Sequence, residues 1–292
     1  MLEHTHSYYW KRLITCASLC FLAQATYATN YYTEHKISLA LQNTIDPKEI
    51  VWLKSNPFTR TLGLYKDAQG KKTLGTALIL ADLSHHPDWP QIINPLRNNL
   101  PAHGWQTFSI HMPEKMANAS AFELENIYQV TKSRITSAIN HLTTKGSHNI
   151  VIIARRHSAN IAIKYLVENE DSRKNVTGFV GISIFDSPWI NTSQLLRKMP
   201  IPYLDIFAQY DTPEVLISAP KRLMSAKFSG LQYNAPPQTS RSTKVQQLAK
   251  NKTGNLYYRQ TIINSAHSHF SKLQHTLIKS IRGWLKSAET SR

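Results

Sequence analysis

Four short segments of the chain hold the side chains that could do chemistry. Each follows a run of residues that predicts a β-strand, and each contains serine, histidine, aspartate or arginine. The segments are residues 82–90, 154–159, 209–213 and 265–270. Because the carboxyl ends of parallel strands lie along one edge of an open α/β sheet, we expect the four segments to meet there.

Arginine and histidine make two of these segments basic. Arg155 and Arg156 lie in the second segment, and His85 and His86 lie in the first. At one sheet edge they would form the cationic mouth of a pocket. Such a pocket suits a carboxylate or phosphate ligand, because a guanidinium donates two parallel hydrogen bonds to such a group. In the alternative, both arginines turn outward or pair with acids elsewhere in the chain. The sequence leaves both alternatives open.

Histidine spacing gives only weak support for a metal site. His267, His269 and His275 are close in sequence, but no H-E-x-x-H or comparable frame is present. The only cysteines, Cys16 and Cys20, lie in the first 20 residues, so they cannot form a zinc site or a nucleophile in the rest of the chain. We predict no metal and no cofactor.

Alternating strands and helices must position the four segments. The run at 149–154 is the strongest signal in the chain for a strand buried on both faces. Other strands are predicted at 49–53, 61–65, 76–81, 106–110, 178–184, 203–208 and 261–263, and helices at 90–100, 121–144, 160–167 and 270–285. The alternation predicts the α/β class: a mostly parallel sheet with helices on both faces.

The first 25 residues predict an export signal. Lys11 and Arg12 precede an apolar run at 13–22, and small residues follow, with cleavage expected after Ala25 or after Ala28. The run is too short to span a bilayer. We therefore expect a periplasmic or secreted protein that is not transmembrane once processed. Residues 26–46 predict an irregular lead-in, residues 47–287 a single domain, and residues 288–292 a tail.

The net charge of +16 is concentrated in the C-terminal quarter of the chain. Residues 215–288 contain 12 lysines and arginines and no acid. Within them, residues 228–255 have few large apolar side chains and predict a basic, disordered surface insertion. Such a run either is solvated or meets an anionic partner, such as a surface of the cell envelope. No nucleic-acid motif is present, and export argues against that partner.

The order of the segments resembles the α/β-hydrolase superfamily. A strand–turn–helix unit comes first, an aspartate after a later strand comes next, and a histidine in a loop comes last. More closely, the chain resembles an uncharacterised family of exported α/β-hydrolase-like proteins from Gram-negative bacteria. The segments that carry this resemblance are residues 80–90, 96–97, 100–105, 203–206 and 281–285, including His86-Pro87-Asp88-Trp89 and Arg282-Gly283-Trp284-Leu285.

The resemblance implies the roles of a serine hydrolase of the esterase type, acting on a small ester. Asp211 would orient the catalytic histidine and stabilise its cation. His269 is favoured as that histidine, and His267 is the alternative. The loop at 82–90 would supply a backbone N–H group to an oxyanion hole.

The chain departs from this pattern at the nucleophile. The superfamily has G-x-S-x-G there, with small residues two positions before and after the serine. Aligned without a gap, Ala154 and Ser158 take the small positions and Arg156 takes the nucleophile position, where a guanidinium cannot attack an acyl group. The other alignment makes Ser158 the nucleophile but places Arg156 and Asn160, both bulky, in the small positions. Sterics favour the first alignment.

Three functions are compatible with these features of the sequence. The favoured one is an envelope protein of hydrolase fold with a degenerate nucleophile turn and a non-catalytic binding or scaffolding role. The first alternative is an active serine hydrolase that uses Ser158, Asp211 and His269. The second is a binder of anionic surfaces through residues 215–288.

Overall fold

The computed structural model describes residues 31–56, 59–70, 72–115, 118–228, 232–233 and 257–290. The chain divides into two compact units, one ending at Ile45 and the other running from Asp46 to the C-terminus. The predicted export signal lies outside the described residues. So does the predicted insertion at 228–255, apart from residues 228, 232 and 233.

The first unit contains a helix over residues 31–42, where the sequence predicts an irregular lead-in over 26–46. This part of the prediction is corrected. The segment has no glycine or proline and includes good helix formers such as Leu39, Ala40 and Leu41. Lys36 Nζ lies 4.5 Å from the ring centroid of Tyr32, four residues before it, which is a pairing that supports a helix.

The second unit is built on a nine-stranded sheet with the order β1-β2-β4-β3-β5-β6-β7-β9-β8. β1 and β2 pair antiparallel, as do β2 and β4, and every other pair of neighbouring strands is parallel. The strands are β1 (Ile50–Lys54), β2 (Arg60–Lys66), β3 (Gly75–Leu80), β4 (Trp105–Ile110), β5 (Ile150–Arg155), β6 (Val176–Ile182), β7 (Tyr203–Tyr210), β8 (Gln232–Tyr233) and β9 (Tyr257–His267).

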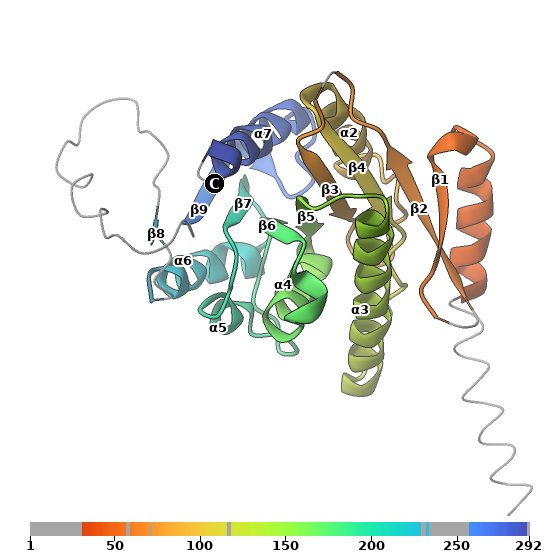
Figure 1. Ribbon diagram of the computed structural model, residues 1–292. Helices are drawn as coiled ribbons and strands as arrows, with labels where there is room; N and C mark the ends of the chain where they lie inside the picture. Colours follow the sequence, from red (N-terminus) through yellow and green to blue (C-terminus); the bar gives the residue numbers. More distant parts are fainter. Residues whose placement is uncertain are drawn as a thin grey trace, which may run out of the picture. The chain divides into compact units, whose positions relative to one another are not determined.

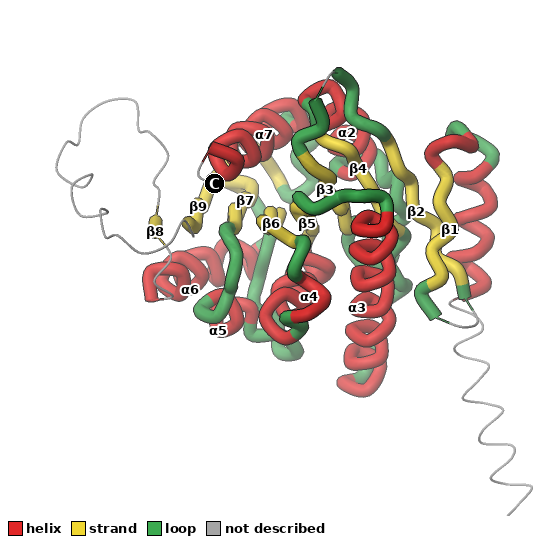
Figure 2. Tube along the Cα trace, viewed as in Figure 1, coloured by secondary structure: helices red, strands yellow, loops and turns green. Residues whose placement is uncertain are grey.

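Helices cover both faces of this sheet (Figure 1). α2 (Ile93–Asn99) and α7 (Gln274–Thr290) lie on one face. The other face carries α3 (Ala121–Thr144), α4 (Arg156–Glu168), α5 (Thr192–Leu196) and α6 (Pro213–Phe228). Short 3-10 turns are η1 (Pro47–Glu49), η2 (Leu100–His103) and η3 (Asp171–Arg173). The predicted α/β class, a mostly parallel sheet between two helical layers, is confirmed; Figure 2 shows the strands between these layers.

Several elements differ from their sequence-based prediction. α5, α6 and β8 are not predicted at all, and α4 begins at Arg156 rather than at residue 160. β9 covers Tyr257–His267, whereas the apolar run predicts only 261–263. Polar side chains such as Gln260 and Asn264 interrupt the apolar pattern of β9, and its hydrogen bonds to β7 extend the strand beyond that pattern.

The centre of the sheet brings two of the predicted segments together. β3 and β5 pair in parallel and in register from Thr76–Ile150 to Leu80–Ala154. Both strands are buried, with Leu78, Ile79, Ile152 and Ile153 at most 1 % exposed. The residues that follow these two strands, Asp82 and Arg156, are therefore neighbours at the carboxyl edge.

Candidate functional site

No loop residue separates β5 from α4. Arg155 ends the strand and Arg156 begins the helix with a φ angle of 48°. A positive φ is uncommon for a residue other than glycine, and backbone strain of this kind is concentrated at functional sites. Arg156 therefore occupies the strained strand-to-helix position. Ser84 and Ser183, which follow β3 and β6, also have positive φ angles.

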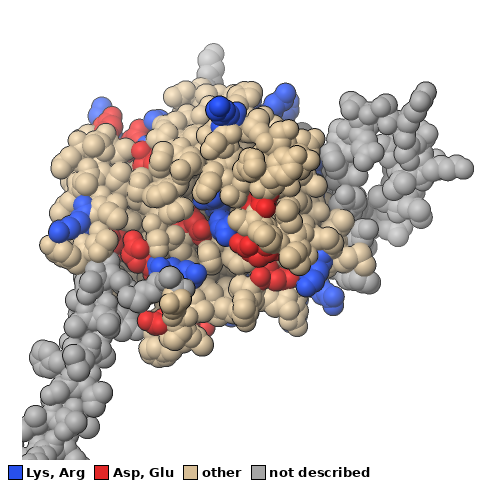
Figure 3. Space-filling model, turned by 180° about the vertical axis from the view of Figure 1, so that it is seen from behind, with Lys and Arg blue, Asp and Glu red and all other residues tan. Residues whose placement is uncertain are grey.

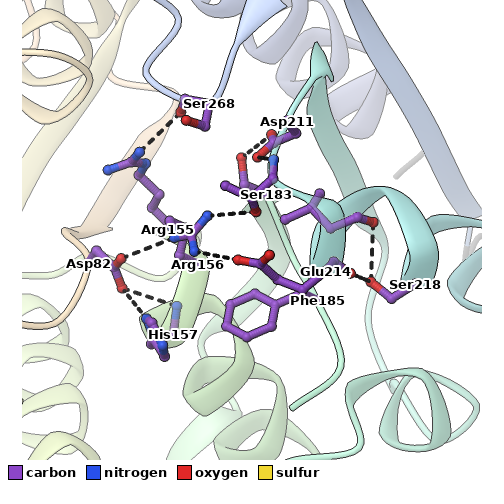
Figure 4. Close-up of polar contacts among 12 residues, drawn as sticks. Asp82, Arg155, Arg156, His157, Ser183, Phe185, Asp211, Glu214, Ser218 and Ser268 are labelled. Carbon is purple, nitrogen blue, oxygen red and sulfur yellow. Dashed lines mark hydrogen bonds and ion pairs between the residues drawn. The ribbon is translucent and has the colours of Figure 1, made fainter. Parts of the chain in front are cut away.

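The side chain of Arg156 connects three segments of the sheet edge (Figure 4). Its Nε atom lies 3.5 Å from a carboxylate oxygen of Asp82, after β3. Its two terminal nitrogens donate to Glu214 Oε1 at 2.9 Å and to Thr212 Oγ1 at 3.2 Å, after β7. The guanidinium carbon also lies 5.5 Å from the ring centroid of Phe185. Arg156 is thus paired with acids, which is the second of the two alternatives that the sequence leaves open.

Asp82 also holds the residue after Arg156. The Asp82 Oδ1 atom accepts hydrogen bonds from the backbone N–H of His157 and contacts its ring Nδ1, both at 3.1 Å. Burial alone would raise the pKa of Asp82. The hydrogen bond from His157 and the charges of His157, Arg155 and Arg156 outweigh that effect and hold the pKa below its usual range. Asp82 is therefore an ionised anchor for the start of α4.

Glu214, in the first turn of α6, completes the ionic cluster. Burial raises its pKa, but hydrogen bonds from its own backbone, from Thr212 and from Arg156 outweigh burial and lower the pKa. With both carboxylates ionised, the charge of Arg156 is compensated from two sides. Little of its charge remains to attract an anionic ligand.

Ser158 lies inside the molecule and not at the turn. The residue is fully buried in α4, and its Oγ atom has no hydrogen-bond partner among the described residues. Within that part of the chain, no hydrogen bond joins Ser158 to His267 or His269. The structure therefore does not bring Ser158 together with the predicted base.

Among the described residues, Asp211 is hydrogen-bonded at the ends of neighbouring strands and to no histidine. Its carboxylate accepts hydrogen bonds from Ser183 Oγ at 2.7 Å, from the Ala208 N–H at 3.1 Å and from the Thr212 N–H at 2.9 Å. All three donors lie after β6 or around the end of β7. These contacts satisfy Asp211 as a buried turn aspartate.

The two candidate histidines, His267 and His269, are both exposed. The ring centroid of His267 lies 5.3 Å from that of Tyr210. Ser268 lies between His267 and His269 in sequence, and its backbone oxygen accepts a hydrogen bond of 3.0 Å from buried Arg155. Burial lowers the pKa of Arg155, and Asp82 and Asp211 oppose that effect. Arg155 thus connects the strained turn to the loop that carries both histidines.

His85 and His86 contribute little positive charge at neutral pH. The ring of His85 stacks on Trp89 with a centroid distance of 3.8 Å, and burial lowers its pKa to about 4. Burial also lowers the pKa of His86, whose Nδ1 atom accepts a hydrogen bond from the Asp88 N–H. On the face shown in Figure 3, Lys and Arg are mixed with Asp and Glu. The two histidines of the predicted cationic mouth therefore add little positive charge, and the charge of Arg156 is compensated by Asp82 and Glu214.

The His-Pro-Asp-Trp segment has a structural explanation. Asp88 accepts hydrogen bonds from Arg97 Nε at 3.0 Å and from Asn94, and buried Arg97 also pairs with Glu49. This network connects the loop after β3 to α2 and to η1. Within the described ranges, no group of three or more His, Cys, Asp or Glu residues could hold a metal ion. Nor is any helix in those ranges long and apolar enough to cross a membrane.

Sequence reasoning missed the partners of Arg156. Asp82, Thr212 and Glu214 lie within or next to the predicted segments, but they were not assigned to the site. A signal was available, because an arginine at a crowded turn needs a carboxylate nearby and Asp82 directly follows the neighbouring strand. What sequence could not show was that α6 begins at Pro213 and brings Glu214 to the same edge.

The fold and the position of this turn define a protein of the α/β-hydrolase fold. Thermogutta terrifontis esterase 2, phosphoramylated by tabun, is similar with a TM-score of 0.60 and 9% identity, over 84% of this chain and 96% of that chain. Est1E from Butyrivibrio proteoclasticus has a TM-score of 0.57 and 7% identity, over 82% and 98%. An alpha-beta serine hydrolase homologue from Coxiella burnetii has a TM-score of 0.52 and 12% identity, over 82% and 97%. At these identities the likeness shows the fold alone.

The family model of a protein of unknown function, DUF3530, matches residues 22–127 and 117–234. These two matches cover well over half of the chain, which therefore belongs to that family. The resemblance to an uncharacterised family of α/β-hydrolase-like proteins is confirmed. Among curated proteins, none matches this chain.

Proposed function

We propose that this protein is an α/β-hydrolase-fold protein without acyl-transfer activity, with a binding or scaffolding role in the cell envelope. The observation that supports this most directly is Arg156 at the strained position between β5 and α4. A guanidinium remains protonated and cannot act as a nucleophile. Its pairing with Asp82 and Glu214 makes it a fixed part of the sheet edge.

The contacts of the other predicted catalytic residues support the same proposal. A nucleophile and its base need to lie within hydrogen-bond reach, and the base needs an orienting acid. Ser158 is buried without such a contact in the described part of the chain, and Asp211 is bonded to Ser183 and to two backbone N–H groups. An active hydrolase built on Ser158 would require α4 to open.

The envelope location in this proposal depends on the N-terminal sequence. Lys11, Arg12, the short apolar run and the Ala-Gln-Ala at 23–25 support export. The chain recovered from the envelope fraction should then begin at Thr26 or Thr29, as read by mass spectrometry. A chain recovered with Met1 intact would contradict export.

A fluorophosphonate probe tests the lack of acyl-transfer chemistry. We expect no labelling of the purified protein, because no serine hydroxyl is activated at the turn. Hydrolysis of a p-nitrophenyl ester should likewise not exceed the rate with the Ser158→Ala variant, which serves as the matched control. Labelling of the original protein that disappears in Ser158→Ala would overturn the proposal in favour of an active serine hydrolase.

A further inference from the structure

An active hydrolase of this fold holds the negative oxygen of its reaction intermediate between two backbone N–H groups, which form the oxyanion hole. One N–H group belongs to the residue after the nucleophile, and the other belongs to the loop after strand β3. In this chain His157 follows Arg156, which occupies the nucleophile position, and Leu83 lies in the loop after β3. His157 and Leu83 therefore lie where the donors of an oxyanion hole would be.

The N–H groups of both residues point at one atom, Oδ1 of Asp82. The Leu83 N–H donates to it at 2.9 Å, and the His157 N–H donates to it at 3.1 Å. An oxyanion hole holds its oxygen at about 2.7–3.1 Å from each donor. Asp82 and His157 are 75 residues apart in the chain, so the pairing of β3 with β5 is what brings the two donors to one oxygen.

The carboxylate of Asp82 has the surroundings of a bound anion (Figure 4). Its Oδ1 atom also lies 3.1 Å from the ring Nδ1 of His157, and its Oδ2 atom lies 3.5 Å from Nε of Arg156. Burial raises its pKa, but His157 and the arginines beside it outweigh burial and lower the pKa, so the buried group is ionised at neutral pH. The start of α4 adds the partial positive charge of a helix N-terminus.

We propose that the Asp82 carboxylate is an internal ligand of this oxyanion hole and closes it to substrate. The carbonyl oxygen of an ester cannot accept hydrogen bonds from Leu83 and His157 while Asp82 holds both N–H groups. The inference deepens the proposed function and rests on it, because the position of the hole follows from Arg156 in the nucleophile position. It adds a second cause of inactivity: the donors that would stabilise the intermediate are already engaged.

The two donors are held in place by contacts other than the carboxylate. Next to Leu83, the Ser84 N–H donates to the backbone oxygen of Pro113 at 3.0 Å, and Ser84 Oγ accepts a hydrogen bond from the Lys115 N–H at 2.8 Å. The N–H of His157 is held by the backbone of α4. Both donors should therefore stay in place when the carboxylate is removed, and a free anion of the same size should bind to them.

Formate tests the proposal, because Asp82→Ala removes a carboxylate and leaves the Cβ atom. Urea unfolding of the purified variant is measured in sodium formate and in sodium chloride at equal ionic strength. We expect about 0.2 M formate to lower the unfolding equilibrium constant of the variant by about tenfold relative to chloride, as a ligand does at about ten times its dissociation constant. A carboxylate that only tied α4 to β3 could not be replaced in this way.

Asp82→Asn is the matched control. Asparagine has the size of aspartate and leaves no room for formate, so formate should stabilise this variant no more than chloride does. The original protein, in which the hole is already filled, should behave in the same way.

The amide proton signals of Leu83 and His157 report the contact directly. With isotope-labelled leucine and histidine, both signals should move upfield in Asp82→Asn, because a neutral amide oxygen is a weaker acceptor than a carboxylate. In Asp82→Ala both signals should return downfield as formate is added. If Asp82→Ala does not fold, the signals of the isosteric Asp82→Asn variant still decide the question.

Three results would overturn the proposal. The first is a folded Asp82→Ala variant that formate stabilises no more than chloride does. The second is equal stabilisation of Asp82→Ala and Asp82→Asn by formate, which would be a general salt effect. The third is an unchanged amide signal of Leu83 or His157 in Asp82→Asn. Fluorophosphonate labelling of the original protein would instead contradict the proposed function, and none of these three measurements depends on it.

Discussion

Arg156 combines an unfavourable backbone with favourable side-chain contacts. Its φ angle of 48° lies in the left-handed region, which costs about 1–2 kcal/mol for a residue with a Cβ atom. The guanidinium offsets this cost through Asp82, Thr212 and Glu214. The side chain therefore stabilises a turn whose backbone alone is strained.

Replacing Arg156 by glycine and by alanine separates the two effects. Both variants lose the ionic contacts, so their difference reports the backbone. We expect Arg156→Gly to be more stable than Arg156→Ala by about 1 kcal/mol, because glycine adopts a positive φ without a steric cost. Urea unfolding measures the difference.

The same pair of substitutions at Lys164 is the matched control. Lys164 lies in the interior of α4, and glycine there costs about 1 kcal/mol relative to alanine. The order of stability should therefore be reversed. Equal stability of Arg156→Gly and Arg156→Ala would show that the turn is not strained.

The elements show which parts of the fold a sequence can predict. β3, β5 and α3 follow clear apolar periods, and the residues of α3 match the prediction of 121–144. α6 lacks such a clear signal: Leu216, Ile217 and Met224 are exposed, its buried residues include Arg222 beside Val215 and Ala219, and Pro220 lies inside it. Periodicity assumes that apolar residues face the core, so it fails where an ion pair holds the helix.

The Arg-Gly-Trp-Leu segment on α7 gives a prediction at this scale. Trp284 is fully buried, and a Cβ atom built on Gly178 of β6 would lie 2.9 Å from Cη2 of its ring. Gly178→Ala should therefore destabilise the protein by about 1–3 kcal/mol, because the indole must shift. Urea unfolding followed by circular dichroism measures the change.

Gly283 in the same segment should behave in the opposite way. A Cβ atom there would meet nothing within 4 Å, and glycine in a helix interior costs about 1 kcal/mol relative to alanine. Gly283→Ala should thus stabilise the protein by up to about 1 kcal/mol. If Gly178→Ala proved as harmless as Gly283→Ala, α7 would not pack closely on β6.

At the scale of the whole molecule, the sequence predicts which segments meet at the sheet edge. It does not predict which side chains contact each other there. The strand–helix alternation brings residues 82–90, 154–159 and 209–213 to one edge, and the pairing of β3 with β5 agrees. Which side chains meet depends on tertiary distances of about 3 Å. Asp211 illustrates this limit, because the donors that satisfy it, Ser183 and the backbone of Ala208, carry no sequence signature.

Half-buried His85 and buried His111 make the stability of the molecule depend on pH. Burial lowers the pKa of His85 to about 4 and that of His111 to about 3, from an ordinary value of 6.5. In the unfolded chain both bind protons near pH 6.5, so the stability is fully present above that pH and is lost as pH falls toward 4. The lowered pKa values of Asp82 and Glu214 act in the same direction at still lower pH.

We therefore expect the free energy of unfolding to be smaller at about pH 5 than at about pH 7.5. His85→Phe should reduce that difference, because it keeps an aromatic ring against Trp89 and removes one titrating group. His148→Phe, at an exposed turn, is the control and should retain the difference. Urea titrations at the two pH values give the comparison, and an unchanged difference in His85→Phe would contradict the assignment.

The buried Arg222–Asp205 ion pair fixes the rotation of α6 about its own axis. If α6 rolled to bury Ile217 and Met224, the guanidinium of Arg222 would leave Asp205. That would leave a carboxylate inside the protein without its cation, a loss of about 3–5 kcal/mol. The ion pair therefore allows α6 only one orientation about its own axis. The orientation of its outer side is determined from within the fold, before anything outside the molecule touches it.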